Sequence, residues 1–465
     1  MHDINTLFAK FSAILQPHQV LADQSSRAFY GRDWIKDFPA NPSLILLPES
    51  TEQVAAIVRL ARGLKVSLVP SGGRTGLSGG ATASHEEVVV SLERMRKVLS
   101  VNPLDRTLHC QAGVTLAKVQ EDAGHNGLFF PIDFSSRGSS QIGGNIATNA
   151  GGIKVIRYGN IRDWVLGLTV VTGAGEVLEL NGPLFKNNTG LDIKNLFVGS
   201  EGILGIITEC ILKLTSQPGP LCRAMCALSS IDDVIPLLSF CRARVRELSA
   251  FELIESGPFH EVIHHRMLRN PFAEKYDTYI LIEVEENSPA VRESFQNTLG
   301  EALENGLLRD VVLSESTAQA EELMNIRDLV SETLSSHYTL HKNDISVPVP
   351  SIPKFIHELK ASIQAIYPSH KVMIFGHVGD GNLHVNVLKP EGLSDEAFWK
   401  ECESADTTIF SLVQKYRGSV SAEHGVGKLK RPYLSFSRSP AEIEIMRGIK
   451  RTLDPDGIMN PGKVI

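Results

Sequence analysis

Two histidines flank a predicted hairpin turn in the segment KVMIFGHVGDGNLHVNVLK, residues 371–389. Asp380–Gly381 is a strong signal for a two-residue turn between apolar strands, and a turn there places His377 directly opposite His384. Paired residues share one face of a sheet with Cβ atoms roughly 4.5–5.5 Å apart, close enough for both imidazoles to bind one ion. Asn386 lies two residues beyond His384 and therefore points to the same face. A histidine on a strand is more often an ordinary hydrogen-bonded residue, so both interpretations stay open on this pattern alone.

The segment GSVSAEHGVGKLK, residues 418–430, adds a carboxylate, Glu423, and the adjacent His424. Alone, such a pair is more typical of a solvated turn. Together with His377 and His384, however, Glu423 completes a set of two histidines and one carboxylate. That set leaves coordination positions open, which is the pattern of a catalytic rather than a structural zinc site. An open site can accept a bidentate substrate, such as the carboxylate and hydroxyl of a 2-hydroxy acid.

Three glycine-rich segments are the second kind of functional pattern. Five of the nine residues from Gly72 to Gly80 are glycine, directly after a predicted strand, and further segments follow at 138–152 and 199–206. Glycine permits positive φ and lets backbone N–H groups approach an anion such as a diphosphate. The spacing fits neither the dinucleotide fingerprint GxGxxG nor the P-loop GxxxxGK[ST]. One such loop is more often just a turn, but three within 140 residues favour a cofactor site.

In order and spacing, PSGGRTGLSGG (70–80), PIDFSSRGSSQIGGNIATNAGG (131–152) and GSEGILGI (199–206) resemble the FAD-binding domain of the vanillyl-alcohol-oxidase, or PCMH-type, family. The resemblance covers essentially the whole chain, including the closing MNPGK (459–463). In that family the first loop wraps the FAD diphosphate and the second follows the ribityl chain and ring. The resemblance implies these FAD-binding residues: Pro70, Ser71, Gly72, Gly73, Arg74, Thr75, Gly76, Gly79, Pro131, Asp133, Gly138, Ser139, Ser140, Gly143, Gly144, Asn145, Thr148, Asn149, Gly151, Glu201, Gly202, Gly205, Ile206 and Asn460.

Arg74 departs from the family pattern. Members with covalently attached flavin often carry histidine directly after the Gly-Gly of the first loop, and many other relatives carry asparagine there. Arg74 therefore implies non-covalent FAD, and it is in a position to contact phosphate.

The motifs GHVGDGNLHVNV and SAEHGVGK are similar to those of the D-2-hydroxy-acid dehydrogenases in this FAD family, most closely the group that oxidises D-2-hydroxyglutarate to 2-oxoglutarate. The resemblance implies that His377, His384 and Glu423 bind a divalent metal, expected to be zinc, which holds the substrate. It also implies that His424 is the general base, removing the hydroxyl proton as hydride leaves C2 for the flavin.

A dicarboxylate substrate needs further basic residues. MNIRDLVSETL (324–334) is predicted as a helix with Arg327 and Ser331 one turn apart, and HKNDISVPVP (341–350) as a strand carrying Lys342. On composition alone these are ordinary surface residues. The resemblance places Arg327, Ser331 and Lys342 around the distal carboxylate, with Ser331 replacing a threonine, and adds Asn386 and His424 to the substrate-binding set.

Other substrates and roles remain possible. D-malate would also satisfy Arg327 and Lys342. D-lactate and glycolate fit less well, since the D-lactate dehydrogenase relatives lack the residues equivalent to Lys342 and Asn386. A non-catalytic flavin-binding subunit is a further alternative, but such a subunit has no need of an open metal site.

The elements expected to position these residues suggest an α+β protein. Strands and helices alternate from residue 44 to about 215, and SQPGPL (216–221) marks a change of composition. We expect a PCMH-type FAD-binding domain at 1–215 and an α+β cap or substrate domain with an antiparallel sheet at 216–417. A short helical segment at 418–465 is expected to return to the FAD domain.

Composition narrows the function classes. The net charge of −7 without a basic stripe argues against nucleic acid as a partner. The six cysteines form no CxxC pair, which indicates reduced, mostly buried thiols. The chain shows neither a signal peptide nor an apolar run long enough for a membrane span, so we expect a cytoplasmic enzyme. Without an NAD fingerprint, haem motif or iron–sulfur set, electrons must leave to an external acceptor, by resemblance an electron-transfer flavoprotein. A homodimer is possible.

Overall fold

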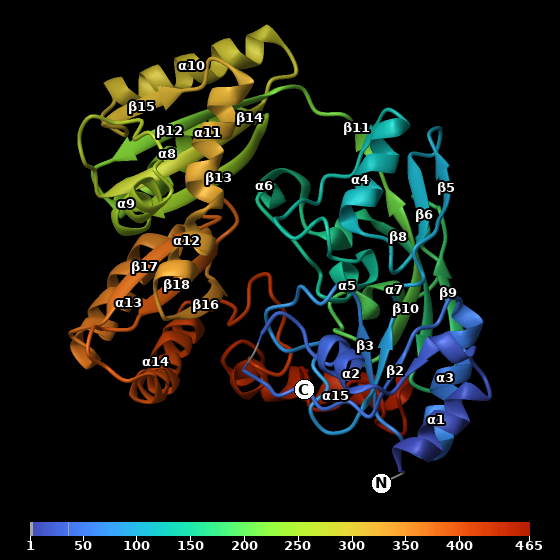
Figure 1. Ribbon diagram of the computed structural model, residues 1–465. Coiled ribbons are helices and arrows are strands. Elements are labelled where there is room, and N and C mark those ends of the chain that lie inside the picture. Colours follow the sequence, from blue (N-terminus) through green and yellow to red (C-terminus); the bar gives the residue numbers. More distant parts are fainter. Residues whose placement is uncertain (1–2, 36) are drawn as a thin grey trace. The chain divides into compact units, whose positions relative to one another are not determined.

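The computed structural model describes residues 3–35 and 37–465. By their internal contacts these residues form two compact units, each built from more than one stretch of chain (Figure 1). Unit 1 comprises Met1–Gly152, Gly159–Gln217 and Glu423–Ile465, and unit 2 comprises Ile153–Tyr158 and Pro218–Ala422. The short stretch Ile153–Tyr158 thus packs with unit 2 although the chain on both sides of it belongs to unit 1.

Unit 1 contains two larger sheets and a short pair of strands. The first sheet has the order β1-β2-β4-β3, in which β2, β4 and β3 run parallel; the second has the antiparallel order β5-β6-β10-β8-β9. The strands of unit 1 are β1 (Val20–Leu21), β2 (Leu44–Leu46), β3 (Leu68–Ser71), β4 (Val88–Ser91), β5 (Val98–Asn102), β6 (Thr107–Gln111), β7 (Leu128–Phe129), β8 (Val165–Thr172), β9 (Val177–Asn181), β10 (Gly205–Lys213) and β11 (Thr215–Ser216).

Helix α3 (Thr51–Leu64) buries one apolar face that includes Val54, Ile57 and Val58. Ser50 caps this helix by accepting a hydrogen bond from the Gln53 backbone amide, and the Gln53 side chain accepts from the Glu49 amide. The N-terminal helix begins at Ile4, and Met1 and His2 lie outside the described residues. The helices are α1 (Ile4–Ser12), α2 (Gln24–Tyr30), α3 (Thr51–Leu64), α4 (Leu116–His125), α5 (Ile142–Ala147), α7 (Lys194–Phe197) and α15 (Pro440–Leu453), with 3₁₀ turns η1 (Pro17–Gln19), η2 (Ile161–Trp164) and η5 (Arg431–Phe436).

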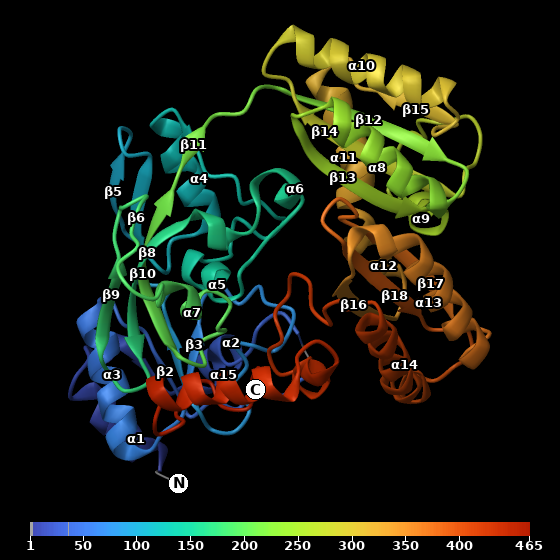
Figure 2. The same cartoon turned by 180° about the vertical axis from the view of Figure 1, so that it is seen from behind.

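Unit 2 is built on one seven-stranded sheet of order β15-β12-β14-β13-β17-β18-β16, in which every neighbouring pair is antiparallel (Figure 2). Its strands are β12 (Leu221–Leu228), β13 (Leu248–Glu255), β14 (Thr278–Glu285), β15 (Asp310–Leu313), β16 (Leu340–Ser346), β17 (Lys371–Gly376) and β18 (Asn382–Leu388). The antiparallel sheet expected for this part of the chain is therefore present.

Helices cover both faces of this sheet. On one face, Phe259 of α9, Leu323 of α11 and Leu334 of α12 pack in one apolar cluster with Tyr279 and Phe375. On the other, α14 packs against β18. The helices of unit 2 are α6 (Val155–Tyr158), α8 (Val234–Arg244), α9 (Ser256–His265), α10 (Pro289–Glu304), α11 (Thr317–Asp328), α12 (Val330–His337), α13 (Ile352–Ile366) and α14 (Asp395–Lys415), with 3₁₀ turns η3 (Ile231–Asp233) and η4 (Val349–Ser351).

The predicted hairpin forms, but its predicted register is wrong. His384 pairs with Phe375 rather than with His377. A type I′ turn needs positive φ at both central residues; Gly381 has φ +97°, whereas Asp380 does not adopt positive φ. Instead, the His377 carbonyl accepts hydrogen bonds from the amides of Asp380, Gly381 and Asn382 at 3.1–3.2 Å, which makes a longer connection. His377 consequently lies beyond the end of β17.

The predicted helix over 324–334 is interrupted. Leu329 separates α11 from α12, so Arg327 and Ser331 belong to two consecutive helices rather than to one. Arg327 is buried whereas Ser331 is exposed.

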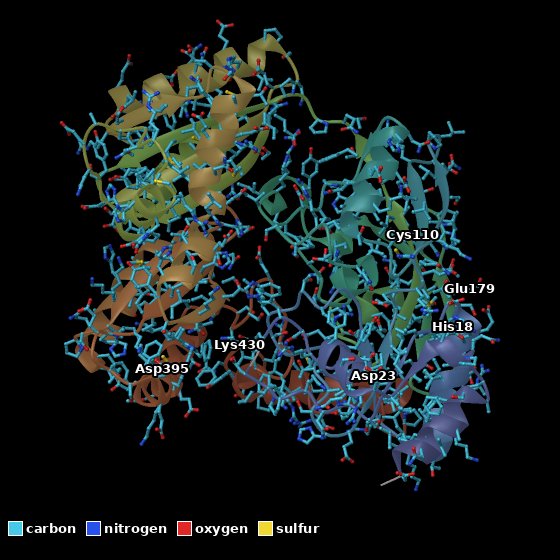
Figure 3. The ribbon with its side chains drawn as sticks, viewed as in Figure 1. His18, Asp23, Cys110, Glu179, Asp395 and Lys430 are labelled. Atoms are coloured by element: carbon cyan, nitrogen blue, oxygen red, sulfur yellow. The ribbon has the colours of Figure 1, made fainter. Side chains whose placement is uncertain are left out.

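All six cysteines are buried and unpaired by disulfides, as the sequence indicated. Cys110, labelled in Figure 3, lies on β6 directly opposite Cys210 of β10, with 3.6 Å between the two Sγ atoms. Within residues 3–35 and 37–465, no helix has the length and apolar character needed to cross a membrane.

Candidate functional site

A cleft of about 900 Å³, partly open to solvent, lies in unit 1 where the glycine-rich loops meet. Fifteen of the residues expected to bind FAD line it: Pro70, Ser71, Gly72, Gly73, Arg74, Thr75, Gly76, Gly143, Gly144, Asn145, Thr148, Glu201, Gly202, Gly205 and Ile206. The sequence therefore located most of the wall of this cleft.

Close backbone approach explains why glycine is needed in these loops. A Cβ atom at Gly73 would lie 2.0 Å from the carbonyl oxygen of Ser139, and one at Gly205 would lie 2.4 Å from that of Val171. Side chains at these positions would force the cleft-forming loops apart. Gly73 thus lets the first loop pack closely against the second, and Gly205 lets the third loop pack closely against strand β8.

Several polar atoms of the cleft are buried without a hydrogen-bond partner among the described residues. They belong to side chains that line the cleft, and they are Ser71 Oγ, Asp33 Oδ2, Arg74 Nη1 and Gln141 Oε1. Such atoms cost free energy unless a ligand supplies their missing partners. Together with the glycine-lined walls, this mixed set of donors and acceptors fits a large polar cofactor carrying a diphosphate, as FAD does.

Arg74 is held by aromatic rings and a carboxylate. Its guanidinium carbon lies 4.3 Å from the centre of the Phe29 ring and 4.6 Å from that of Tyr30, and Nη1 lies 3.9 Å from Glu93 Oε2. Burial lowers the pKa of Arg74. The backbone at Arg74 has φ +58°, a conformation that asparagine adopts more readily than most residues. The asparagine that the family resemblance implies at this position would suit this conformation, whereas Arg74 gains the cation–π contacts.

Asp33 is a cleft residue that the sequence did not single out. Burial raises the pKa of the Asp33 carboxyl to about 6. Hydrogen bonds from the Ile35 amide and the Thr82 hydroxyl to Asp33 Oδ1 act in the opposite direction and lower this pKa. It precedes the first glycine loop by about 40 residues, and no motif surrounds it. Gln141, by contrast, lies inside the second loop and could have been included on position alone.

Nine residues expected to bind FAD do not line the cleft, so their contact with FAD stays a prediction. Two of the nine contact residues of the cleft wall: Ser140 Oγ accepts from the side-chain amide of Asn145 at 3.4 Å, and the side chain of Asn460 donates to the Gly80 and Glu201 carbonyls. The nine are Gly79, Pro131, Asp133, Gly138, Ser139, Ser140, Asn149, Gly151 and Asn460.

Glu201 connects the cleft wall to the segment that carries Glu423 and His424. Its carboxylate oxygens accept hydrogen bonds from the Val426 and Gly427 amides, both at 2.7 Å. Burial raises the pKa of Glu201 to about 7, against the lowering effect of these two amides. A Cβ atom at Gly425 would lie 2.8 Å from the same carboxyl group, so glycine is required where the segment passes Glu201.

Three of the six expected metal and substrate residues of unit 2, namely Lys342, His384 and Asn386, lie on one sheet face. Asp344 and Phe375 pair with His384 from the two sides, and Lys342 pairs with Asn386 in the next row. The side chains of Lys342, Asp344, His384 and Asn386 point to the same face as Phe375, which belongs to the apolar cluster packed against α11. The rings of His377 and His384 have centroids 5.4 Å apart, so the two imidazoles do lie together despite the different register.

Each of these imidazoles faces a buried carboxylate that the sequence did not reveal. His377 Nδ1 lies 2.7 Å from Glu252 Oε2, and His384 Nδ1 lies 3.5 Å from Asp344 Oδ1. A carboxylate at Nδ1 favours the tautomer in which Nε2 is the lone-pair nitrogen, the arrangement common to zinc-binding histidines. The donor set therefore fits a divalent metal of the zinc type.

The three residues assigned to the distal carboxylate occupy different surroundings. The Arg327 guanidinium stands 5.1 Å above the Phe375 ring and donates from Nε to Glu252 at 2.9 Å. Lys342 is exposed on β16, yet partial desolvation lowers its pKa. Ser331 is exposed on α12, and no hydrogen bond between its hydroxyl and Arg327 or Lys342 occurs in the described chain. Its substrate contact remains a prediction.

Glu423 and His424 begin the last stretch of unit 1, and chain connectivity limits where Glu423 can lie. The preceding residue, Ala422, belongs to unit 2, and its amide donates to Asp344 Oδ2 at 3.2 Å. Consecutive Cα atoms are about 3.8 Å apart. The backbone of Glu423 therefore starts one residue away from the carboxylate that faces His384.

Two family profiles match successive parts of the chain. The profile described as "FAD binding domain" matches residues 42–181, and that described as "FAD linked oxidases, C-terminal domain" matches residues 218–464. A D-2-hydroxyglutarate dehydrogenase of Stutzerimonas stutzeri (strain A1501) is 46% identical over 458 residues, which cover 98% of both chains. The chain belongs to the D-2-hydroxyglutarate dehydrogenase family. A D-2-hydroxyglutarate dehydrogenase of Xanthomonas citri pv. viticola is 47% identical, and the match covers 94% of this chain and 92% of the relative. A mitochondrial D-2-hydroxyglutarate dehydrogenase of Arabidopsis thaliana is 35% identical, and the match covers 98% of this chain and 80% of the relative.

Solved structures agree on the fold. p-Cresol methylhydroxylase with bound substrate superposes with a TM-score of 0.80 at 15% identity, covering 99% of this chain and 96% of that chain. Alkyldihydroxyacetonephosphate synthase superposes with a TM-score of 0.75 at 20% identity, covering 99% and 85%. The PCMH-type, α+β fold predicted from the sequence is confirmed, and with it the FAD cofactor of this family.

The contact between the first two loops can be tested at Gly73. A Gly73→Ala substitution should weaken FAD retention at least tenfold, because its Cβ would overlap the Ser139 carbonyl and push the loops apart. The measurement is FAD dissociation followed by flavin fluorescence. Gly138→Ala is the matched control, since a Cβ there meets nothing within 4 Å. Equal FAD affinity in wild type and Gly73→Ala would contradict the role of this contact.

Glu201 should make stability depend on pH. Its folded pKa of about 7 lies above the ordinary 4.5, so the folded state binds the extra proton between these values and loses stability as pH rises through that window. Glu201→Gln mimics the neutral form and lacks this dependence. Guanidinium unfolding of the FAD-loaded protein should therefore show the wild type losing up to roughly 3 kcal/mol relative to the variant between pH 4.5 and 7. A difference that stays constant with pH would show that Glu201 is already ionised at acid pH.

Proposed function

We propose that the protein oxidises D-2-hydroxyglutarate to 2-oxoglutarate with FAD as the hydride acceptor and a divalent metal, zinc or a similar ion, at the substrate. The family assignment supports the reaction. The observation that carries the substrate assignment is the sheet face of unit 2, where a row holding His384 is followed by a row holding Lys342 and Asn386. A dehydrogenase for another D-2-hydroxy acid is the alternative, and D-malate is the member of that group that shares the need for two cationic contacts.

The spacing of these two rows suits a dicarboxylate. Residues two apart on a strand are separated by about 6.8 Å along it, comparable with the span between the two ends of an extended five-carbon diacid. We assign the C1 carboxylate and C2 hydroxyl to the end of the face with His377, His384 and Glu423. The distal carboxylate is assigned to Lys342 and Asn386, which are directly paired.

Charge supports the same assignment. Lys342 has its pKa lowered by desolvation, and a carboxylate beside it would favour the protonated form again. Arg327, whose guanidinium is held over the Phe375 ring, provides further N–H donors on this face, although its charge is balanced by Glu252. A monocarboxylate such as D-lactate would leave Lys342 without an anionic partner.

The proton and the hydride are assigned to different acceptors. A divalent metal held by His377, His384 and Glu423 would lower the pKa of a coordinated hydroxyl. FAD held in the cleft of unit 1 would supply the acceptor for the hydride of C2. We assign removal of the hydroxyl proton to the neutral imidazole of His424, which neighbours Glu423 in the chain. Glu201 holds the segment that carries both residues through the Val426 and Gly427 amides.

The electrons then pass to an external acceptor, for which we propose an electron-transfer flavoprotein. The buried, unpaired cysteines provide no iron–sulfur ligand set. A cytoplasmic location and a homodimer are retained from the sequence as part of the proposal.

Anaerobic flavin reduction tests the substrate assignment. D-2-hydroxyglutarate should bleach the flavin absorbance faster than D-malate, D-lactate or glycolate at equal concentration. Lys342→Ala should lower kcat/KM for D-2-hydroxyglutarate about 10- to 150-fold, which corresponds to roughly 1.5–3 kcal/mol for the loss of a charged hydrogen bond. The same change should leave any D-lactate turnover nearly unchanged.

Lys389→Ala, which removes a lysine of the same unit that pairs with Asp395, controls for general charge attraction and should have little effect. Equal losses for both substrates in Lys342→Ala would indicate a structural role for Lys342. A wild type that prefers D-lactate would overturn the dicarboxylate assignment.

The role of His424 has a kinetic signature. His424→Ala should retain FAD and metal while the saturating rate of flavin reduction falls by about 10²-fold or more, the scale for losing a general base. Stopped-flow absorbance with excess substrate measures this rate directly. If the variant only needed more substrate and reached the wild-type rate at saturation, His424 would be a binding residue instead.

A further inference from the structure

Glu252 is a buried carboxylate whose role no motif in the sequence indicates. It lies on β13 within the run LSAFELIE and is 1% exposed. β13 pairs with β17 so that Leu253 is opposite Gly376 and Ile254 opposite Phe375. Continuing this register by one residue brings Glu252 opposite His377, just beyond the end of β17.

A single oxygen of Glu252 contacts two residues of the proposed site. Oε2 lies 2.7 Å from His377 Nδ1 and accepts a hydrogen bond from Arg327 Nε at 2.9 Å. Arg327 Nη2 also lies 3.4 Å from His377 Nδ1. The side chains of Glu252, His377 and Arg327 therefore contact one another in pairs, and the two shortest contacts are those of the carboxylate.

These distances determine which nitrogen of His377 carries the proton. If Nδ1 were unprotonated, its lone pair would face the Glu252 carboxylate at 2.7 Å, which is repulsive. The only gain would be a long hydrogen bond from Arg327 Nη2 at 3.4 Å. A proton on Nδ1 makes the short contact a charge-assisted hydrogen bond instead. Nε2 is then the lone-pair nitrogen of the neutral ring, as a metal ligand requires.

The same carboxylate balances the charge of Arg327, which is itself 6% exposed. A buried guanidinium without an anion is strongly unfavourable. With Glu252 in place, Arg327 is fixed above Phe375 and cannot compete with a metal for His377. Without it, an unbalanced positive charge would remain beside His377 and repel a metal ion.

We propose that Glu252 is a positioning residue that fixes the tautomer and orientation of His377 and neutralises Arg327, thereby setting the metal affinity of the site. The proposal rests on the assignment of His377 as a metal ligand in the proposed function.

A matched control is available on the same sheet face. Glu283 of β14 is fully buried and forms an ion pair with Arg223 at 2.7 Å, with Lys154 at 3.6 Å. Removing its charge also breaks a buried ion pair. No contact joins it to His377 or Arg327 in the part of the chain that the structure describes. It reports what loss of a buried carboxylate does by itself.

The test compares Glu252→Gln and Glu283→Gln in the FAD-loaded, metal-stripped protein. Zinc affinity is measured by competition with a chromophoric chelator, and flavin absorbance verifies that the cofactor cleft is intact. We expect zinc to bind 10- to 100-fold more weakly to Glu252→Gln and within threefold of wild type to Glu283→Gln. Both variants should lose stability to guanidinium, so stability alone does not distinguish them.

The outcomes separate this inference from the proposed function. If wild type binds no zinc stoichiometrically, the metal assignment and this inference both fail. If wild type and Glu252→Gln bind zinc equally, only this inference fails. Should Glu252→Gln not fold, Glu252→Asp takes its place: its shorter side chain should weaken zinc binding at least threefold, and wild-type affinity would overturn the proposal.

Discussion

A carboxylate buried in a sheet must be matched by a cation or by several hydrogen-bond donors, and this constraint organises the polar part of unit 2. Glu252, Glu283 and Glu285 point to the same face and are at most 1% exposed. Breaking one partner away from a buried ion pair typically costs about 3–5 kcal/mol. Their partners come from distant parts of the chain: Arg327 and His377 for Glu252, Arg223 and Lys154 for Glu283, and Arg157 and Tyr158 for Glu285. Satisfying buried charge thus holds a helix, a loop and the short α6 segment on one sheet.

Unit 1 shows the opposite arrangement. In its cleft, polar atoms such as Ser71 Oγ and Gln141 Oε1 are buried without partners among the described residues. A bound FAD would offer hydrogen-bond partners to these atoms, and a ligand that binds only the folded state stabilises that state. The carboxylates of unit 2 are satisfied by the chain itself, whereas these atoms of unit 1 are not. This difference suits a fixed arrangement of side chains in unit 2 and a ligand-binding cleft in unit 1.

Sequence reasoning succeeded where the requirement is local. Glycine at 73 and 205 is imposed by backbone carbonyls that leave no room for Cβ, and such positions stand out as glycine clusters. It failed where distant contacts decide. Glu252 and Asp344 sit in ordinary strand sequences, and only the sheet order brings them to His377 and His384. The predicted hairpin register was wrong because the His377 carbonyl accepts hydrogen bonds from three amides. The predicted helix at 324–334 is interrupted at Leu329, although the segment contains neither glycine nor proline to mark a break.

The α6 segment gives unit 2 an unusual assembly problem. Residues 153–158 are synthesised long before β14, yet Lys154 and Arg157 contact Glu283 and Glu285, some 130 positions later in the chain. Glu283 and Glu285 become available to these cations only after β14, the third strand of the sheet in chain order, has been synthesised. A fragment cut at 218–422 would contain every strand of the sheet, but Glu285 would lose Arg157 and Tyr158, and Glu283 would keep Arg223 while losing Lys154. The spatial unit therefore draws part of its charge balance from a stretch of chain that precedes it by about 60 residues.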